Sequence, residues 1–184
     1  MLRSLMMSLW VSILFLTLTG CGSMVPENDA DKQYQDSQVQ GTIQAFKDVD
    51  PSIQSFFDSA YGYAVFPSIG SGAIGIGGAG GNGQVFQQRN LIGYCQMGQA
   101  NIGLALGGQT YSEIIFFQNA AALATFQAGQ TAFDARANAV AAASGAGTAA
   151  DYQDGVVVFT KPLDGLMFQA AIGGQHFSYA PLVH

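Results

Sequence analysis

The sequence predicts an α+β domain in which N-terminal helices pack on a curved, glycine-rich antiparallel β-sheet, with one further helix inserted before the last strands. Two observations predict this fold. Apolar residues recur at helical spacing between residues 32 and 60, whereas from Tyr63 onward short β-like runs alternate with glycines. The chain has 24 glycines among 184 residues, and glycines repeated along strands are typical of a sheet that bends or bulges.

Two helices are expected before the sheet. In the first, over residues 32–47, apolar residues lie four and three positions apart and would form one face. The second has Asp50 as its cap, Pro51 in its first turn and Gly62 as its end. Its apolar stripe consists of Ile53, Phe56, Phe57 and Ala60. We expect this stripe to pack on the sheet; the alternative is that it dips into a bilayer, although the basic flank typical of interfacial helices is missing.

Short strands separated by glycines are expected next. The predicted ranges are Tyr63–Phe66, Ala73–Ile76, Gln84–Gln88, Leu91–Met97, Asn101–Leu106 and Thr110–Phe117. The inserted helix is predicted over Ala120–Ala128, with Asn119 as its cap and Gly129 as its stop.

The last third of the chain is predicted to return to strands. Alternation of apolar and polar residues over Phe133–Ala139 indicates a half-buried strand, and the small residues of Ser144–Ala150 indicate a loop. A hairpin is then expected, in which Val156–Lys161 and Leu166–Ile172 flank a turn at 162–165.

The first 21 residues have the pattern of an export signal. One basic residue, Arg3, precedes an uncharged apolar segment that closes in Leu18-Thr-Gly-Cys21. This ending resembles the lipobox of bacterial lipoproteins, which implies cleavage after Gly20 and acylation of Cys21. The alternative is a transmembrane helix, for which the uncharged stretch is at the short end of the spanning range.

The lipobox resemblance predicts the organisation and location of the chain. Residues 1–20 would be the signal peptide, 21–31 a lipidated tether, and 32–184 the folded domain. Several acyl chains anchor a protein stably to a bilayer. Because Gly22 rather than Asp follows the cysteine, the sorting rule for lipoproteins implies the outer membrane of a bacterial envelope, facing the periplasm.

Composition and motifs argue against several classes of function. Without Arg3 the chain keeps five Lys and Arg against twelve Asp and Glu, a net charge of −7, which argues against a nucleic-acid partner. Residues 75–80 match G-x-G-x-x-G, but a turn and a strand follow instead of the helix that a dinucleotide site needs. We expect no catalytic residue, cofactor or metal site, and His176 and the pair Asp151 and Asp154 are not expected to be catalytic. Cys95 is expected to be a small buried hydrophobe, with a reactive thiol as the alternative.

Several segments resemble one family, the SYLF domain. They are Ala60-Tyr-Gly-Tyr-Ala-Val-Phe-Pro67, the glycine-rich stretch Gly70–Gly83, Gly107-Gly-Gln-Thr-Tyr-Ser-Glu-Ile-Ile-Phe116 and Leu163–Ile172. The likeness covers about residues 40–180 and implies lipid binding, since eukaryotic relatives bind phosphoinositides and some also bind actin. This chain lacks a basic segment before the domain, and its few basic residues are scattered. The resemblance therefore implies the fold and a general association with lipid, without headgroup specificity.

The leading hypothesis is a non-enzymatic envelope lipoprotein that binds lipid or associates with the membrane surface. Acyl chains would enter an apolar groove between helices and sheet, lined by Phe56, Phe57, Phe66, Ile74 and Ile76, although each of these residues is equally explained as core. The second hypothesis is a structural module that contacts another envelope protein or itself, with lipid contact only through Cys21. An enzyme of unknown chemistry is the third.

Overall fold

The computed structural model describes residues 23–74, 76–102, 107–129, 139–141, 143–164 and 175–182. Its helices are α2 (Asp29–Val49), the 3-10 turn η1 (Pro51–Ile53), α3 (Gln54–Ser59), α4 (Ala120–Gln127) and α5 (Ala146–Ala149). Its strands are β1 (Gly62–Ile74), β2 (Ile76–Gln87), β3 (Asn90–Ile102), β4 (Gly107–Phe117), β5 (Ala139–Ala141), β6 (Val156–Asp164) and β7 (Gln175–Pro181).

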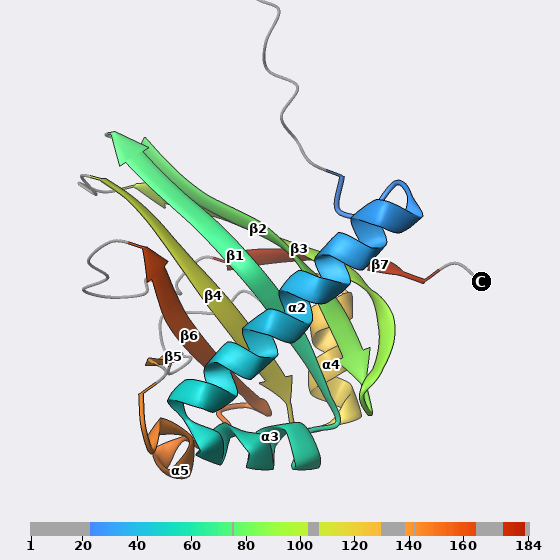
Figure 1. The fold of residues 1–184 in the computed structure, drawn as a ribbon, viewed down its shortest axis with the longest axis vertical. Helices are drawn as coiled ribbons and strands as arrows, with labels where there is room; N and C mark the ends of the chain where they lie inside the picture. Colours follow the sequence, from blue (N-terminus) through green and yellow to red (C-terminus); the bar gives the residue numbers. More distant parts are fainter. Residues whose placement is uncertain are drawn as a thin grey trace, which may run out of the picture.

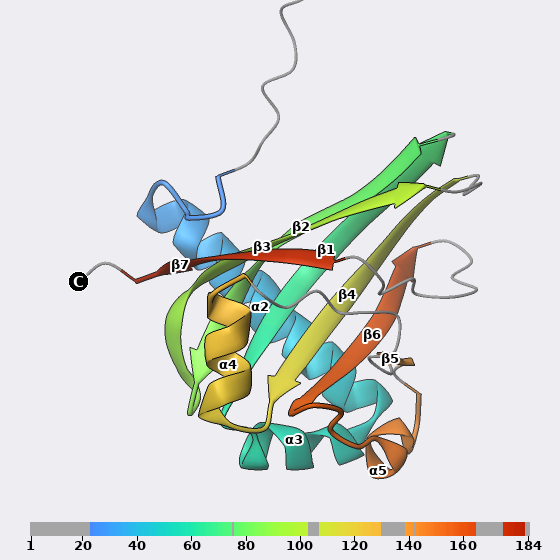
Figure 2. The ribbon, with the colours of Figure 1, turned by 180° about the vertical axis from the view of Figure 1, so that it is seen from behind.

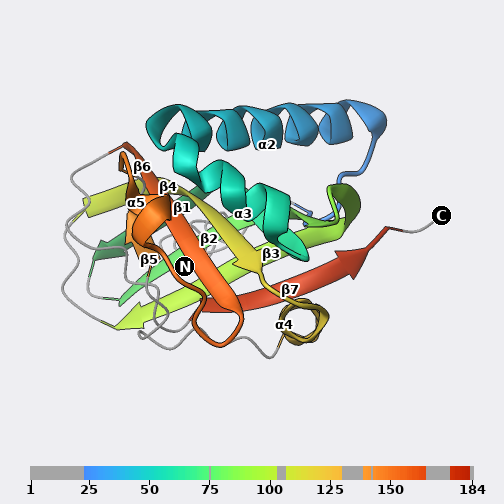
Figure 3. The same ribbon diagram turned by 90° about the horizontal axis from the view of Figure 1, so that it is seen from below.

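The strands form one sheet in the order β5-β6-β4-β1-β2-β3-β7. All neighbouring strands are antiparallel except the parallel pair β5–β6. Helices α2 and α3 cover one face of the sheet, while α4 lies on the other face (Figures 1 and 3). The predicted class, α+β with a curved antiparallel sheet, N-terminal helices and one inserted helix, is confirmed.

Both faces of the sheet are buried, which explains the uninterrupted apolar runs of its central strands. In β4, Ile114 and Phe116 face the cluster under α2 and α3, while Ile115 and Phe117 face the cluster under α4. Strand β6 alternates in the same way, with Val157 on the face covered by α2 and α3. Since successive side chains of a strand point to opposite faces, a strand covered on both faces has no polar alternation.

The helices that precede the sheet follow most of their local signals, but α3 ends at Ser59, and Gly62, its predicted end, is the first residue of β1. Helix α2 buries Val39, Ile43 and Phe46, the predicted face, and its cap is Asn28. Asp50 caps the next segment, as predicted, but Pro51 begins a 3-10 turn that leads into α3.

The inserted helix α4 matches its predicted boundaries closely. The Asn119 side chain accepts a hydrogen bond from the Ala122 N–H, and Gly129 follows with a positive φ of 67°. Leu123 and Phe126 are buried beneath it.

The glycine-rich segments are continuous strand, so the predicted short strands merge into long ones. Strand β1 runs through Gly70, and β2 pairs with it from end to end apart from a register shift between Val65 and Gly70. A Cβ on Gly83 would lie 2.5 Å from the Val65 carbonyl oxygen, and one on Gly81 would lie 2.5 Å from that of Ser68. These glycines therefore let β2 approach the irregular part of β1 closely.

Three further predictions need correction. Residues 162–164 belong to β6 instead of forming a turn, because Pro162 lies beside a register shift in the β4–β6 pairing, where its missing N–H is tolerated. The predicted loop 144–150 contains the short helix α5. Helix α2 begins at Asp29, inside the predicted tether, because Asn28 caps it there. The predicted segments 133–138 and 166–172 lie outside the described residues.

The sheet curls, so that its β7 edge lies over one of its own faces (Figure 2). Strand β7 crosses the face that carries α4, as the view from behind shows (Figure 2). The apolar cluster under α4, which joins Phe66 of β1 to Phe126 of α4 and Phe177 of β7, fills the space inside this curl. Among the described residues, none of the helices combines the length and the apolar character required to cross a membrane.

Candidate functional site

The residues predicted to line a lipid groove lie on opposite faces of the sheet. Phe56 and Phe57 are buried under α3, where their rings contact the ring of Phe116 at centroid distances of 5.5 and 4.8 Å. Phe66 is buried on the other face, 5.7 Å from the ring of Phe177. These three residues therefore do not share a groove in this conformation, and they contribute to two separate clusters.

The remaining predicted site residues can be placed only in part. The backbones of Ile74 and Ile76 pair with each other at the end of the β1–β2 hairpin, and their side chains lie outside the described part of the structure. Cys21, the predicted acylation site, also lies outside the described residues.

A surface groove of about 540 Å³ lies where the described chain begins, and we call it the amino-terminal groove. The segment before α2, the first turns of α2, and strands β1 and β2 all contribute to it. Its lining residues are Ser23, Val25, Pro26, Glu27, Asp31, Tyr34, Gln35, Gln38, Pro67, Ser68 and Asn82. The groove brings together parts of the chain that are more than 40 positions apart, so no local pattern in the sequence indicates it.

Exposed apolar side chains gather at this groove. Tyr34 is 68% exposed and Val25 is 39% exposed. Leu163, at 44% on strand β6, is the other large hydrophobic side chain that is exposed in the described part of the chain. Most large apolar side chains of this domain are buried, so the pair in the groove is a feature that packing does not explain.

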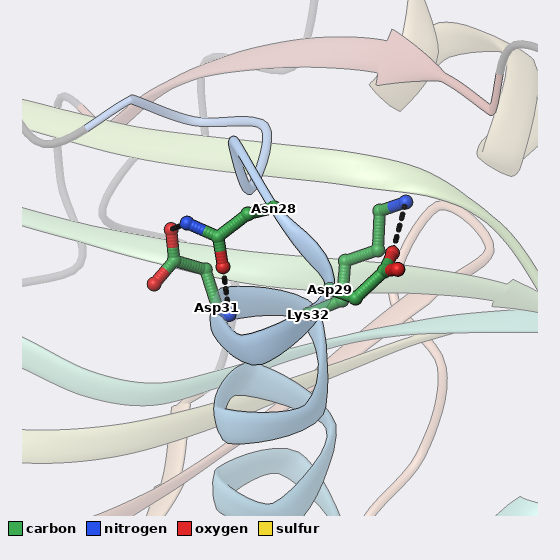
Figure 4. A network of polar contacts seen from close by, with 4 residues as sticks. All are labelled: Asn28, Asp29, Asp31 and Lys32. Carbon is green, nitrogen blue, oxygen red and sulfur yellow. Dashed lines mark hydrogen bonds and ion pairs between the residues drawn. The ribbon is translucent and has the colours of Figure 1, made fainter.

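Polar contacts hold the segment before α2 in place. The Asn28 side chain accepts from the Asp31 N–H at 2.9 Å and donates to the Asp31 carboxylate at 2.8 Å, while Lys32 pairs with Asp29 at 3.4 Å (Figure 4). The Asn82 side chain donates to the Ser23 carbonyl oxygen at 3.2 Å. The bond from Asn82 attaches the start of the described chain to the sheet, whereas the contacts of Asn28 and Lys32 support the first turn of α2.

Two further bonds fix α2 over β2. The Gln84 side chain donates to the Asp36 carboxylate at 2.6 Å, and the Gln35 side chain donates to the Gly83 carbonyl oxygen at 3.5 Å. Gln84 is itself buried, so its pairing satisfies a polar group that water cannot reach.

The charged side chains that line the groove are acidic, namely Glu27 and Asp31. Lys32, which follows Asp31 in α2, is exposed and pairs with Asp29. Within the described residues, the groove has no converging group of Lys and Arg of the kind that holds a phosphorylated headgroup. Its chemistry suits apolar or neutral contacts at a surface better than recognition of an anion.

A buried polar cluster lies inside the curl of the sheet, and the sequence analysis did not identify it. Glu113 of β4 is 0% exposed, and its carboxylate accepts from the Gln175 side chain of β7 at 3.1 Å. Gln175 also lies 3.5 Å from the Tyr111 hydroxyl. The alternation of β4 does indicate that Glu113 is buried, since Glu113 lies on the same face of the strand as the apolar residues Ile115 and Phe117.

Burial changes the titration of this cluster. Desolvation raises the pKa of the Glu113 carboxyl to about 7, although the bond from Gln175 acts in the opposite direction. Burial also raises the pKa of the Cys95 thiol and of the Tyr111 hydroxyl, and the nearby Glu113 adds to both shifts. Cys95 is fully buried within the apolar cluster, in agreement with the prediction of a small buried hydrophobe.

The other candidates considered for catalysis are dispersed. His176 is exposed on β7, and Asp151 and Asp154 are exposed beside the turn before β6. The described part of the chain contains no group of three or more His, Cys, Asp or Glu side chains placed to hold a metal ion.

Comparison with known proteins gives one informative similarity. The chain is 28% identical over 127 residues to beta cell expansion factor A from Aeromonas veronii. The matched region is 69% of this chain and 49% of that protein, so the chain spans about half the length of the relative it matches. No family model matches the chain.

Proposed function

We propose that this chain is a non-enzymatic envelope lipoprotein of the SYLF type that associates with the membrane surface through its amino-terminal groove. The observation that carries the proposal is the pair of exposed apolar side chains, Val25 and Tyr34, in the groove at the start of the described chain. Aromatic residues with one polar end are favoured where apolar and aqueous phases meet.

The position of the lipid anchor supports this assignment. Cys21 precedes Ser23 by two residues, which span at most about 7 Å of extended chain. Ser23 is bonded to Asn82 on the sheet. Acyl chains on Cys21 would therefore hold the amino-terminal groove at the bilayer surface of the outer membrane, where Val25 and Tyr34 would enter the interfacial layer.

The charge of the groove indicates which membranes it suits. Glu27 and Asp31 would be repelled by anionic headgroups, and the net charge of −7 expected for the acylated chain acts in the same direction. We therefore expect contact with neutral and zwitterionic lipids, unlike the phosphoinositide binding of eukaryotic SYLF domains.

The SYLF assignment rests on the positions of the resembling blocks. The block from Ala60 to Pro67 includes the first part of β1, and the block from Gly107 to Phe116 coincides with β4. These two strands are neighbours at the centre of the sheet. The blocks thus supply adjacent core strands, as a shared domain would require.

Vesicle flotation of the chain from Gly22 onward tests the proposal, because this form has no acyl anchor. We expect it to float with phosphatidylethanolamine-rich vesicles and to lose most of its flotation when Val25→Asp and Tyr34→Asp are combined. Leu163→Asp is the control, since Leu163 is also an exposed large apolar residue, at 44%, but lies outside the groove.

Native mass spectrometry of the same form, purified from envelopes without detergent, adds a second readout. Bound phospholipid would support a lipid site. A lipid-free chain that stays out of every vesicle layer and self-associates would contradict the proposal, and would favour the alternative of a structural module whose lipid contact is its anchor at Cys21.

A further inference from the structure

Strand β7 has a single neighbour among the described strands of the sheet. It is an edge strand, and among the described strands it pairs only with β3, from Gly93↔Pro181 to Gln99↔Gln175. Helix α4 also lies against it. Besides this backbone pairing, side-chain interactions hold β7 over the interior, among them the ring contacts of Phe177 with Phe66 and Phe126.

One of these interactions joins β7 to the centre of the sheet. The Gln175 side chain donates to Glu113 Oε2 at 3.1 Å, although β1, β2 and β3 separate β4 from β7 in the strand order. This contact is geometrically allowed because the sheet curls and β7 crosses its concave face (Figure 2). The bond thus connects the edge strand β7 to the central strand β4 across the inside of the curled sheet.

The two side chains leave a matching pair of unsatisfied atoms. Glu113 and Gln175 are both 0% exposed. Glu113 Oε1 and Gln175 Oε1 are buried and have no hydrogen-bond partner among the described residues. Two unpaired acceptors in one buried contact are costly, and a single proton placed on one of them would satisfy both.

We propose that Glu113 is protonated in the closed fold and that its Oε1–H donates to Gln175 Oε1, so that the two side chains form a proton-dependent clasp that holds β7 over the interior of the sheet. The carboxyl and the amide then exchange two hydrogen bonds and carry no charge. When the clasp opens, the proton leaves for water and the carboxylate becomes solvated.

The surroundings of Glu113 favour the neutral form. Its cross-strand neighbours are Phe66 in β1 and Thr160 in β6, and α4 contributes Leu123 and Phe126 to the same cluster. The titratable groups that face it in the described structure are Tyr111 in β4 and Cys95 in β3, and burial keeps both of them neutral. The part of β7 beside the clasp contributes His176, which is exposed.

The sign of the pH effect follows from linkage. Burial raises the pKa of Glu113 from an ordinary value of 4.5 to about 7. The closed form therefore binds the proton more tightly, so the clasp is fully effective below about pH 4.5 and weakens as the pH rises through 7. These two values predict that opening of β7 increases about thirtyfold between pH 5.5 and pH 8.5.

Carbon NMR can test the protonation directly. The chain has two glutamates, Glu27 and Glu113, so selective 13C labelling of glutamate carboxyls gives two signals, which Glu27→Gln assigns. The exposed Glu27 supplies the reference. We expect the Glu113 carboxyl to remain protonated at pH 6. Titration of Glu113 together with Glu27 would overturn the proposal.

Amide hydrogen exchange of the full chain tests the clasp itself. After correction for intrinsic rates, exchange in β7 should rise about thirtyfold more in the wild type than in Glu113→Gln between pH 5.5 and 8.5. The variant keeps an amide–amide version of both hydrogen bonds but cannot ionise. Asp48→Asn, an acid-to-amide change on the exposed side of α2, should behave as the wild type. Equal pH profiles in wild type and Glu113→Gln, or an equal response in α2 and β7, would overturn the clasp.

Discussion

Replacing Asp50 by alanine should destabilise the domain strongly, because this buried carboxylate joins two distant parts of the chain. It accepts from the Ser52 N–H at 3.1 Å and the Ser52 hydroxyl at 2.7 Å at the start of η1. It also accepts from the Gly145 N–H at 3.2 Å and the Gly147 N–H at 2.6 Å, nearly 100 positions away at α5. In Asp50→Ala all four donors lose their partner.

The size of the effect can be worked out from these bonds. Loss of a helix cap costs about 1 kcal/mol, and each hydrogen bond to a charged group contributes about 1.5 to 3 kcal/mol. With two such bonds to α5, the free energy of unfolding should fall by about 4 kcal/mol or more. That is a large fraction of the roughly 5–15 kcal/mol that stabilises an ordinary domain.

The effect of Asp50 should also depend on pH. Desolvation alone would raise the pKa of this carboxyl, but the bonds from Ser52, Gly147 and Gly145 outweigh it and lower the pKa. A lowered pKa in the folded state means that the ionised group stabilises the fold above its ordinary pKa of 3.8. This contribution is lost as the pH falls through the lowered value.

Urea denaturation of the chain from Gly22 onward measures both effects. The difference between wild type and Asp50→Ala should be constant from pH 5 to pH 8 and should shrink below pH 4. Asp48→Ala is the matched control, because Asp48 is exposed and bonds only to Gln44 in the described structure. If Asp50→Ala and Asp48→Ala differ by less than about 1 kcal/mol, which is the contribution expected from the cap alone, the reasoning is refuted.

Three further stability predictions use the same denaturation assay. Gly83→Ala should destabilise by about 1–3 kcal/mol, because its Cβ would lie 2.5 Å from the Val65 carbonyl oxygen, whereas Gly98→Ala should change little, because no atom lies within 4 Å of its Cβ. Phe116→Ala should lower the free energy of unfolding by about 3–5 kcal/mol, since its ring is fully buried against Phe57. A loss below about 1 kcal/mol would contradict the packing described for the face covered by α2 and α3. Asn119→Ala should cost about 1 kcal/mol by removing the cap of α4, and no loss would contradict that capping role.

Short-range signals made the helices predictable. Asn119 and Gly129 bound α4 through local hydrogen bonding and backbone geometry, which neighbouring residues determine. Strand boundaries were less predictable, because glycines that indicate breaks in isolation are accommodated when a paired strand approaches closely, as at Gly83. Pro162 likewise suggests a turn until its place beside the irregular end of the β4 pairing is known.

The candidate site was less predictable than the fold. Phe56 and Phe66 are apolar in either role, and only the packing of α3 on the sheet reveals that they lie on opposite faces. The amino-terminal groove depends on contacts such as Ser23 with Asn82, which no pattern within a short window can indicate. Glu113 could have been noticed, because it interrupts an apolar face of β4 at an inward position.

Fluorescence of a tryptophan placed in the amino-terminal groove tests membrane association most directly. The sole tryptophan of the sequence is Trp10, so the chain from Gly22 onward contains none, and Tyr34→Trp introduces a single reporter. The account predicts a blue shift with phosphatidylethanolamine-rich vesicles, quenching by bromine-labelled acyl chains, and no such response from Leu163→Trp. An unchanged Tyr34→Trp spectrum, or an equal response from Leu163→Trp, would contradict the claim that this groove contacts the membrane.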